Sequence, residues 1–527
     1  MFLREYEKNM TALFPRLPYL SAIALLTLSA CHAGRPADAA GSEENNAVRP
    51  PNIVIFYVDD LGYGDVSSYG AIGVETPNID HLAANGVRFT DAHSSAATCT
   101  PSRYSLLTGE HGFRRSAKIL RGDAPLLIPT EKQTLPAMLK RAGYTTAVVG
   151  KWHLGLGDGN LDWNAAIRPG PLEIGFDYAF LLPATGDRVP TVYVENHQVV
   201  DLDPADPIEV SYKDKIGGRP TGIESPELLR YETDGQHNKT IVNGVSRIGY
   251  MAGGESALWV DEEFPDVFSA KAAEFIRANK DRPFFLFHSF HDIHVPRLPN
   301  PRFKGKSTMG PRGDAIVQTD WIVGALVDEL EKLGISDRTL LIFTSDNGPV
   351  LNDGYEDQAA ELVGDHKPAG PFRGSKYSAF EGGTRVPSIS YWPGTIKPGS
   401  SAALVSQLDI YASIAELVGV APIDGEASDS RDQLDVWLGR SDTGREYLLE
   451  ESVGGLALRY GQWKYIPPKK NPRPGTASKG IEGGFSTVAQ LYDLGTDSGE
   501  RINLARENPE LVGRLQLQLE RIVADTY

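Results

Sequence analysis

The stretch Asn52-Ile-Val-Ile-Phe-Tyr-Val58 is dominated by apolar and β-branched residues, and it ends at Asp59-Asp60-Leu-Gly62. A run without polar alternation is typical of a parallel strand with both faces covered by helices. A second run, Thr339-Leu-Leu-Ile-Phe-Thr344, ends similarly at Ser345-Asp346-Asn347-Gly348. Ligands of open α/β sheets collect beyond the carboxyl ends of the strands, so we expect both polar groups in one crevice.

Two further runs repeat this arrangement. Thr145-Thr-Ala-Val-Val149 continues into Gly150-Lys-Trp-His-Leu-Gly155, which places Lys151 and His153 just past a buried strand. Pro283-Phe-Phe-Leu-Phe287 continues into His288-Ser-Phe-His-Asp-Ile-His-Val-Pro296, which supplies a histidine cluster that includes His294. Any one of these histidines is more often a structural hydrogen-bonding residue, but their convergence favours a functional site. Together the four units predict an α/β protein with a mostly parallel sheet sandwiched by helices.

The polar groups at the first two strand ends predict a metal site. Asp59, Asp60 and Asp346 contribute carboxylates and Asn347 an amide, and three carboxylates brought together repel one another unless a cation joins them. Oxygen ligands of this kind favour Ca²⁺ or Mg²⁺. Taken alone, an Asp-Asp-x-Gly sequence is usually a solvated turn, so the prediction depends on the pairing of two strand ends.

The stretch Cys99-Thr-Pro-Ser-Arg-Tyr-Ser-Leu-Leu-Thr-Gly109 predicts a nucleophile in an anion site. Pro101 suits the first turn of a helix and Gly109 its end, so Cys99 lies at a helix N-terminus. Free N–H groups and the helix dipole favour an anion there, and Arg103 adds a cation one turn on. The alternative is a buried cysteine that acts as a small hydrophobic residue.

The pattern Cys-x-Pro-Ser-Arg-x-x-x-Leu-Thr-Gly resembles the motif of the type I sulfatases. Gly150-Lys-Trp-His-Leu-Gly155, His294-Val-Pro296 and the block from Phe372 to Pro387 are similar to further motifs of that family. The resemblance covers roughly Pro51 to the end of the chain. It implies an alkaline-phosphatase-like fold, in which a large mixed sheet is joined to a small C-terminal antiparallel sheet and helix.

The resemblance also implies the chemistry. Cys99 is expected to be converted to formylglycine by a formylglycine-generating or sulfatase-maturating enzyme, and its hydrate is expected to bind the metal and attack sulfur. Arg103 and Lys151 would hold the formylglycine and the developing charge, and His153 would assist its second proton. His294 and Lys376 would face the leaving oxygen, an expectation that for Lys376 rests on the resemblance alone. Family and export together favour sulfated carbohydrate as the substrate.

Charge and length limit the class of partner. The 527 residues carry a formal net charge of −17, which argues against nucleic acid because phosphate backbones are bound by basic surfaces. An anionic substrate must therefore be bound by local cations.

The N-terminus predicts export. Basic residues precede a short apolar run from Tyr19 to Leu28, and Leu28-Ser-Ala-Cys31 resembles a lipobox in which Cys31 is acylated. Residues 1–31 are then a signal peptide, 32–50 a flexible linker, and the protein is lipid-anchored in the bacterial periplasm or at the cell surface. The alternatives are cleavage after Ala33, which gives a soluble secreted protein, and translation from Met10.

The remaining chain is predicted to form a catalytic domain at 51–424 and an α+β subdomain at 425–527. Residues 156–260 show little periodicity, so they are expected to be a loop insertion that selects substrate. Between Asp314 and Leu333 the apolar spacing predicts an amphipathic helix.

Two other functions remain open at this point. A phosphatase or phosphodiesterase of the same superfamily would share the strand-end carboxylates, but it would normally carry a Ser or Thr nucleophile and ligands for a second metal. A non-catalytic lipoprotein that binds sulfated glycans is the second alternative, and the intact Cys-x-Pro-Ser-Arg motif argues against it.

Overall fold

The structure is a computed structural model that describes residues 49–472 and 481–524. Arg49–Tyr527 belong to one compact unit. The predicted signal peptide, Cys31 and nearly all of the predicted linker lie outside the described residues. The predicted boundary at residue 424 stays a prediction. Among the helices of the described residues, none is both long and apolar enough to cross a membrane.

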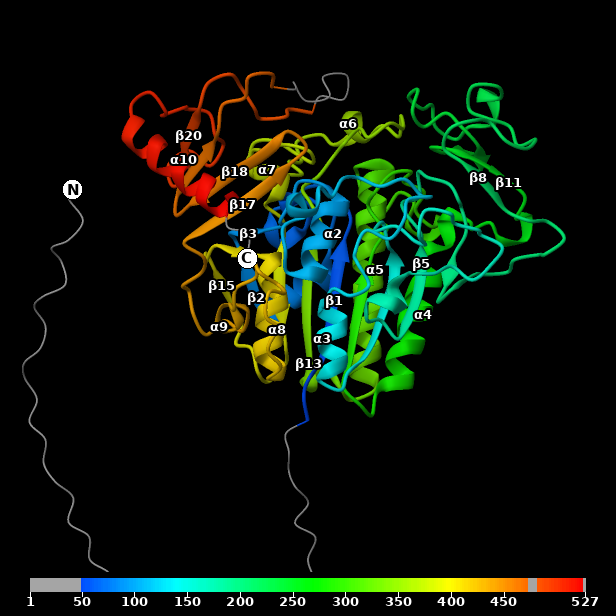
Figure 1. The fold of residues 1–527 in the computed structure, drawn as a ribbon, viewed down its shortest axis with the longest axis horizontal. Helices are drawn as coiled ribbons and strands as arrows, with labels where there is room; N and C mark the ends of the chain where they lie inside the picture. Colours follow the sequence, from blue (N-terminus) through cyan, green and yellow to red (C-terminus); the bar gives the residue numbers. More distant parts are fainter. Residues whose placement is uncertain (1–48, 473–480, 525–527) are drawn as a thin grey trace, which may run out of the picture. The chain divides into compact units, whose positions relative to one another are not determined.

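A large mixed sheet forms the centre of the unit (Figure 1). Its five central strands are parallel, namely β13 (Thr339–Ser345), β1 (Asn52–Val58), β12 (Phe284–Ser289), β4 (Thr145–Lys151) and β5 (Tyr178–Leu182). On one side the sheet continues through β14 (Ser388–Tyr391), β2 (Val87–Phe89) and β15 (Gly399–Ser401), and on the other through β6 (Val194–Glu195) and β7 (Gln198–Val199). The predicted mixed, mostly parallel sheet is confirmed.

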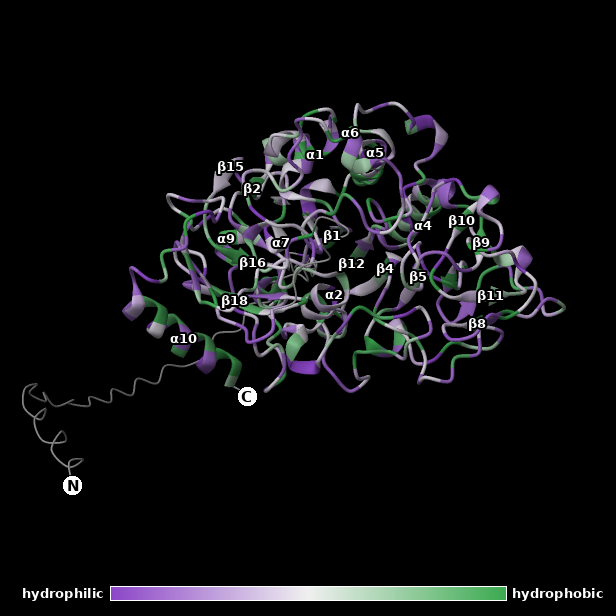
Figure 2. Ribbon diagram, turned by 90° about the horizontal axis from the view of Figure 1, so that it is seen from above, coloured by the Kyte–Doolittle hydropathy of each residue, from purple (hydrophilic) through white to green (hydrophobic). Residues whose placement is uncertain are grey.

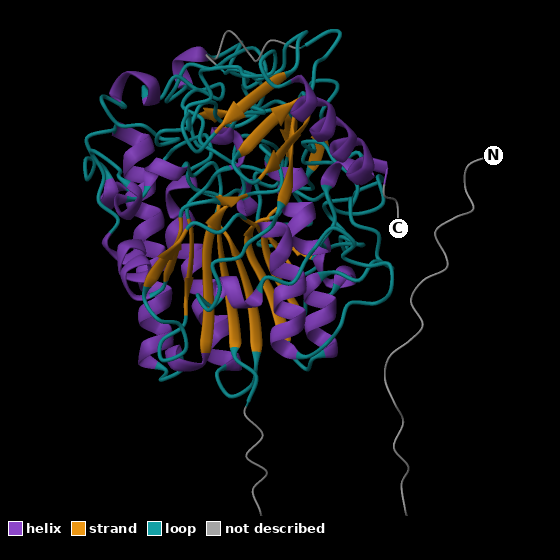
Figure 3. Cartoon of the chain, turned by 90° about the vertical axis from the view of Figure 1, so that its left-hand side faces the viewer, coloured by secondary structure: helices purple, strands orange, loops and turns teal. Residues whose placement is uncertain are grey.

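Helices cover both faces of this sheet (Figure 3). One face packs against α2 (Cys99–Thr108), α3 (Leu135–Arg141) and α8 (Ile410–Val418), and the other against α1 (Pro77–Asn85), α4 (Phe264–Asn279) and α5 (Gly310–Lys332). Seen from above, α1, α4 and α5 lie on one side of the strands and α2 on the other (Figure 2). The helix predicted from Asp314 to Leu333 is confirmed as α5, which begins four residues earlier.

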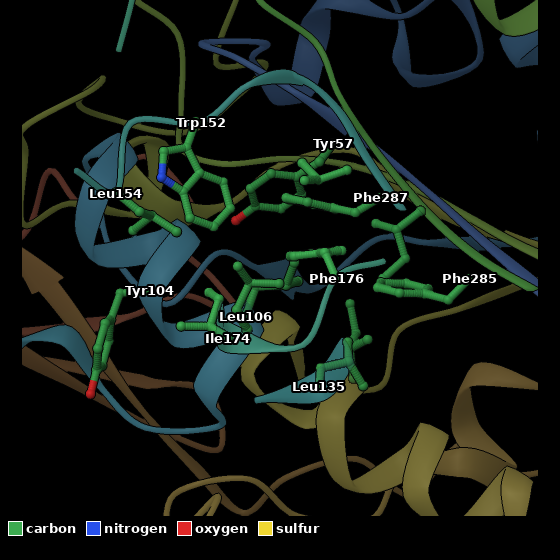
Figure 4. Close-up of a cluster of buried hydrophobic side chains, with 14 of the residues drawn as sticks. Tyr57, Tyr104, Leu106, Leu135, Trp152, Leu154, Ile174, Phe176, Phe285 and Phe287 are labelled. Carbon is green, nitrogen blue, oxygen red and sulfur yellow. The ribbon is translucent and has the colours of Figure 1, made fainter. Parts of the chain in front are cut away.

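Strand β1 shows why the apolar runs are continuous. Ile53, Ile55 and Tyr57 point into one core and Val54, Phe56 and Val58 into the other, and all six side chains are fully buried. Each large apolar side chain buried in this way contributes roughly 1.5–3 kcal/mol of transfer free energy. Figure 4 shows the first core, where Leu106 of α2, Leu135 of α3 and Phe285 and Phe287 of β12 belong to the same cluster.

A second, antiparallel sheet lies in the C-terminal region. It contains β17 (Tyr447–Ser452), β18 (Gly455–Tyr460), β19 (Trp463–Ile466) and β20 (Gln490–Asp493), and α10 (Pro509–Ala524) packs its apolar side on it. Along α10, hydrophobic residues alternate with hydrophilic ones (Figure 2). The apolar run from residue 456 to 466 forms two strands rather than one, because Gly461 takes a φ of 54° in the turn between them. The predicted small sheet with a helix is confirmed.

The segment 156–260 is more ordered than its sequence predicts. Besides β5, β6 and β7 it contains β8 (Glu209–Ser211) paired with β11 (Tyr250–Ala252), and β9 (Ile241–Val242) paired with β10 (Val245–Ser246). These pairs are too short to leave a periodic pattern. The parallel strands run upward in Figure 1, so their carboxyl ends point toward the side on which β8, β11 and the C-terminal sheet lie.

The remaining elements are short. They are β3 (Ala92–His93), which pairs with β16 (Val405–Ser406), and the single-turn helices α6 (Ala359–Leu362), α7 (Glu381–Thr384) and α9 (Leu434–Trp437).

Candidate active site

Four oxygen-bearing residues meet where β1 and β13 end. The strands are in register up to Val58 and Ser345, so Asp59 and Asp60 emerge beside Asp346 and Asn347. The Asp60 amide donates to Asp346 Oδ1 at 3.3 Å, and Asn347 Nδ2 donates to Asp60 Oδ1 at 2.7 Å. All four side chains are fully buried. The structure thus brings together the four predicted metal ligands that follow the two strands, and Cys99, the fifth predicted ligand, is described below.

Each of the three carboxylates has its own cation. Lys151, the last residue of β4, donates to Asp59 Oδ2. Arg103 donates to Asp346 Oδ2 through Nε at 3.0 Å and through Nη2 at 2.8 Å.

The third cation, Lys376, donates to Asp60 Oδ2 at 2.9 Å. Repulsion among the carboxylates is therefore largely compensated by the protein itself. Charge repulsion among the three carboxylates therefore does not by itself require a metal ion.

On balance, the ionised forms of Asp59 and Asp60 are still disfavoured, mainly because both side chains are buried. Desolvation, followed by the negative charge of Asp346, raises the pKa of Asp59 well above its ordinary value, although Lys151 opposes this. Desolvation likewise raises the pKa of Asp60. The pKa of Asp346 is lowered, because Arg103 and the two lysines outweigh the opposing effect of burial. An additional positive charge beside Asp59 and Asp60 would stabilise their ionised forms.

An orphaned acceptor is a separate observation that bears on a metal ion. Within the described residues, the buried Oδ1 of Asn347 has no hydrogen-bond partner, although its Nδ2 donates to Asp60 Oδ1 and to the carbonyl of Gly348. Ligand atoms of Asp59, Asp60 and Asp346 lie within 4.8 Å of one another. An unpaired buried amide oxygen next to converging carboxylates fits a hard divalent cation.

Cys99 is the first residue of α2 and faces this cluster. Its Sγ lies 3.8 Å from Asp59 Oδ1, and the residue is 1% exposed. Burial raises the pKa of the thiol to about 12, so an unmodified Cys99 stays protonated at neutral pH. Helix α2 itself is entirely buried and ends at Gly109, which has a φ of 68°.

Two histidines flank the cluster with one nitrogen each held by the main chain. His153 Nε2 lies 3.0 Å from the carbonyl of Leu120, and among the described residues its buried Nδ1 has no partner. His294 Nδ1 lies 2.7 Å from the carbonyl of Val295, and its Nε2 is 3.9 Å from Asp60 Oδ2. Both carbonyls can only accept, so the lone pairs of the neutral rings lie on Nδ1 of His153 and Nε2 of His294.

The pKa values of both histidines are low. Burial, then the charge of Lys151, holds the pKa of His153 well below its usual range. Burial, then the charge of Lys376, does the same for His294. Every predicted site residue therefore lies in one buried cluster at the carboxyl edge of the sheet.

Several residues of this cluster are not marked by any pattern in the sequence. Asp353 Oδ2 accepts from Lys376 Nζ at 3.1 Å and from the Tyr377 hydroxyl at 3.0 Å. Ser289, at the end of β12, accepts from Arg103. Asp353 lies only six residues after Asn347, but no motif marks it. Ser289 lies within the run that supplies the histidines, and nothing in the sequence distinguishes it from its neighbours.

The insertion contributes two further charged residues. The Arg188 cation is near enough to lower the pKa of His153, an effect that ranks after those of burial and Lys151. Asp187 partly opposes the lowering of the His294 pKa. Asp187 Oδ2 also lies 3.2 Å from His237 Nε2. The sequence predicted the segment as a whole, but nothing in its pattern indicated which residues reach the site.

Comparisons with known proteins agree with this geometry. The sequence model of the sulfatase family matches residues 51–420. An N-acetylgalactosamine-6-O-sulfatase of Bacteroides thetaiotaomicron is 48% identical over 518 residues, which cover 98% of this chain and 99% of that protein. Human arylsulfatase A is 33% identical, covering 90% of this chain and 89% of its own length.

Solved structures give the same result. A sulfatase described with the metabolism of multiple glycosaminoglycans by B. thetaiotaomicron has a TM-score of 0.88 and 49% identity, covering 90% of this chain and 99% of its own. A sulfatase from Pseudoalteromonas sp. has a TM-score of 0.67 and 27% identity, covering 90% of each chain. The chain therefore belongs to the sulfatase family and is a sulfuric ester hydrolase.

Proposed function

We propose that this sulfatase removes the 6-sulfate of N-acetylgalactosamine, using a formylglycine made from Cys99 and one divalent cation. The observation that carries the proposal is the full-length similarity to the B. thetaiotaomicron enzyme, which spans 98% of this chain and so includes the insertion. The buried cluster of Cys99, carboxylates and cations supplies the groups that sulfate ester hydrolysis needs.

The metal would be held by Asp59, Asp60, Asp346 and Asn347. The orphaned Oδ1 of Asn347 and the raised pKa values of Asp59 and Asp60, which burial causes, support a cation at this position. Ca²⁺ and Mg²⁺ both suit four oxygen ligands. A cation bound there would polarise the sulfuryl oxygens, and the hydrate of formylglycine would provide the hydroxyl nucleophile.

The cations and the two neutral histidines around the carboxylates are proposed to form two groups. Arg103 and Lys151 contact Asp346 and Asp59, and Asp59 Oδ1 lies 3.8 Å from Cys99 Sγ, so these two cations would hold residue 99 and the sulfuryl group. Thr100 Oγ1 donates to the main-chain carbonyl of His153, and the lone pair on His153 Nδ1, which has no partner among the described residues, could accept a proton from residue 99.

The second group lies beside Asp60. Lys376 and His294 both approach Asp60 Oδ2, at 2.9 Å and 3.9 Å. Cleavage of the S–O bond places negative charge on the departing sugar oxygen, and a cation or acid is needed to stabilise it. The pKa of Lys376 is raised well above its ordinary value, because the charge of Asp60 outweighs burial, so its ammonium stays charged.

The insertion would bind the sugar. Its loop from Thr185 to Arg188 carries the carboxylate of Asp187 and the guanidinium of Arg188, whose charges act on the pKa values of His294 and His153. Sugar hydroxyls are recognised by charged hydrogen-bonding groups of this kind, which accept and donate in fixed directions. We therefore assign the choice of sugar to this loop, here called the 185–188 loop.

One experiment tests the proposed substrate. Purified protein is incubated with the 6-sulfates of N-acetylgalactosamine and N-acetylglucosamine and with N-acetylgalactosamine 4-sulfate and 6-phosphate, and the released anion is quantified by ion chromatography. We expect release from N-acetylgalactosamine 6-sulfate above the other three, and none from the Cys99→Ala variant. Preferential cleavage of the 4-sulfate or of the phosphate would contradict the proposal.

We further propose that the protein is exported, lipid-anchored at Cys31 and matured by a formylglycine-generating or sulfatase-maturating enzyme. The proposal is supported by the sequence Leu28-Ser-Ala-Cys31 and by the Cys99 motif. Metabolic labelling with a tagged fatty acid tests the anchor, since label should appear in the wild type and be lost in Cys31→Ala. An unlabelled mature protein that begins at Gly34 would favour the soluble secreted form.

A further inference from the structure

Both peptide groups of Gly186, the glycine of the 185–188 loop, are held by buried side chains. Its N–H donates to His291 Nε2 at 3.0 Å. Its carbonyl accepts from the guanidinium of Arg247. We call this arrangement the Gly186 clamp, and it joins the insertion to the segment that follows β12.

His291 can accept the hydrogen bond from the Gly186 N–H only as a neutral ring. An N–H that points at Nε2 requires a lone pair there, so the proton of the ring is on Nδ1. Burial lowers the pKa of His291 to about 3, and the nearby Lys151 acts in the same direction. The ring packs edge-on against Phe264, with centroids 5.2 Å apart, and lies 5.9 Å from the ring of His294.

The other side of the clamp is equally fixed. Arg247 is fully buried and donates to both carboxylate oxygens of Asp261 at 2.8 and 2.7 Å. Its Nη2 also donates to the carbonyl of Val242. The guanidinium therefore has little freedom to move away from Gly186.

The clamp requires a glycine. A Cβ atom at residue 186 would lie 2.5 Å from His291 Nε2, a distance that would force the ring or the loop to shift. The polar groups of the loop lie next to Gly186 in the chain. Thr185 and Arg188 both donate to Asp187 Oδ1. Fixing Gly186 thus fixes how Asp187 and Arg188 are presented to His294 and His153.

We propose that His291 is a positioning residue, which through the Gly186 N–H sets the 185–188 loop in register with His294 and so determines how tightly the sugar binds. The inference rests on the proposed function, in which this loop contacts the sugar. It adds a residue that touches neither the sugar nor the sulfuryl group.

The test compares three variants. His291→Leu removes the acceptor and keeps an apolar side chain, and His291→Gln keeps an acceptor near the position of Nε2. His288→Leu is the matched control, because His288 is also a buried imidazole, three residues earlier, and its ring packs against Phe56 and Phe290. Each variant is assayed on N-acetylgalactosamine 6-sulfate and on nitrophenyl sulfate, which has no sugar.

We expect His291→Leu to raise KM for the sugar sulfate by on the order of tenfold, because the buried Gly186 N–H loses its partner. Its kcat/KM for nitrophenyl sulfate should change by less than about twofold. His291→Gln should bring the KM for the sugar sulfate most of the way back to the wild-type value. His288→Leu should leave the ratio of the kcat/KM values for the two substrates unchanged. Equal losses on both substrates, or no change on the sugar, would overturn the proposal.

Hydrogen exchange gives a readout that does not depend on the substrate. The amide of Gly186 should exchange faster in His291→Leu than in the wild type, and at the wild-type rate in His288→Leu. Unchanged exchange in His291→Leu would overturn the clamp even if the proposed sugar is correct. Faster exchange in a protein whose wild type does not cleave N-acetylgalactosamine 6-sulfate would support the clamp and reject that substrate.

Discussion

Lys376 Nζ lies 2.9 Å from Asp60 Oδ2, and it reaches this carboxylate from 316 residues away in the chain. The same oxygen is 3.9 Å from Nε2 of His294. Asp60 therefore holds Lys376 and lies near His294, the two residues that are proposed to act on the leaving oxygen, whereas Arg103 and Lys151 contact Asp346 and Asp59. We propose that these pairs mark a nucleophile side and a leaving-group side of the site, and kinetics can test this division.

Replacing His294 or Lys376 with alanine should harm poor leaving groups most. A sugar alkoxide needs a proton or a cation as it departs, whereas a nitrophenolate leaves readily. We expect kcat/KM to fall on the order of 10²-fold for the sugar sulfate and distinctly less for nitrophenyl sulfate. Cys99→Ala is the control that should affect both substrates equally. Equal losses in the His294 and Lys376 variants would assign these residues to sulfuryl binding instead.

Removal of the metal should lower both activity and stability. A ligand present at about 100 to 1,000 times its Kd stabilises the folded state by roughly 3–4 kcal/mol, so chelation should lower Tm, and added Ca²⁺ or Mg²⁺ should restore it. The Asn347→Ala variant should need a higher concentration of Ca²⁺ or Mg²⁺ than the wild type for the same increase in Tm. Asn52→Ala is a suitable control, because Asn52 is a buried asparagine at the opposite end of β1. Chelated enzyme that kept its full rate would argue for another role of the carboxylates.

Residue 99 should carry an aldehyde in active protein. Peptide mass spectrometry of residues 99–103 should show the loss of sulfur that accompanies conversion of cysteine to formylglycine. Protein made without a maturation system should fold with the same Tm but have no turnover, because the buried thiol has a raised pKa of about 12. Full activity of a preparation that contains only the thiol would refute this part of the mechanism.

The sequence predicts the strands and the carboxylates more readily than the residues that pair with them. The apolar runs before Asp59 and Asp346 are visible because both faces of β1 and β13 are buried, and in-register parallel strands bring their ends together. Asp353 and Arg188 come instead from irregular segments, where no periodicity relates position in the chain to position in space.

A loop also determines the position of Lys376. The contact between Lys376 and Asp60 depends on the path of the segment before α7, which hydrogen-bonds through Lys376 N to the carbonyl of Pro349. No local pattern encodes that path. Resemblance to the family supplied Lys376, and the structure supplied its partner.

The last prediction concerns stability and a buried carboxyl group far along the chain, Glu500. Its Oε2 accepts the Glu381 N–H at 2.8 Å, and within the described residues its Oε1 has no hydrogen-bond partner. Burial raises its pKa to about 8, and the charge of Glu381 adds to this, although Lys464 and Arg373 oppose it. A pKa above that of the unfolded chain means that the folded state binds the extra proton. The resulting stability is complete below the unfolded pKa and is lost as the pH rises toward about 8.

Glu500→Gln keeps the acceptor for Glu381 and removes the titration. Its free energy of unfolding should match that of the wild type near pH 4.5 and exceed it by on the order of 2 kcal/mol at pH 7, as measured by urea unfolding at a series of pH values. The exposed Glu507→Gln should show no such divergence, because its carboxyl group stays in water in both states. If the curves of Glu500→Gln and the wild type ran parallel from pH 4.5 to 8, Glu500 would be ionised in the folded protein, and Lys464 and Arg373 would outweigh its burial.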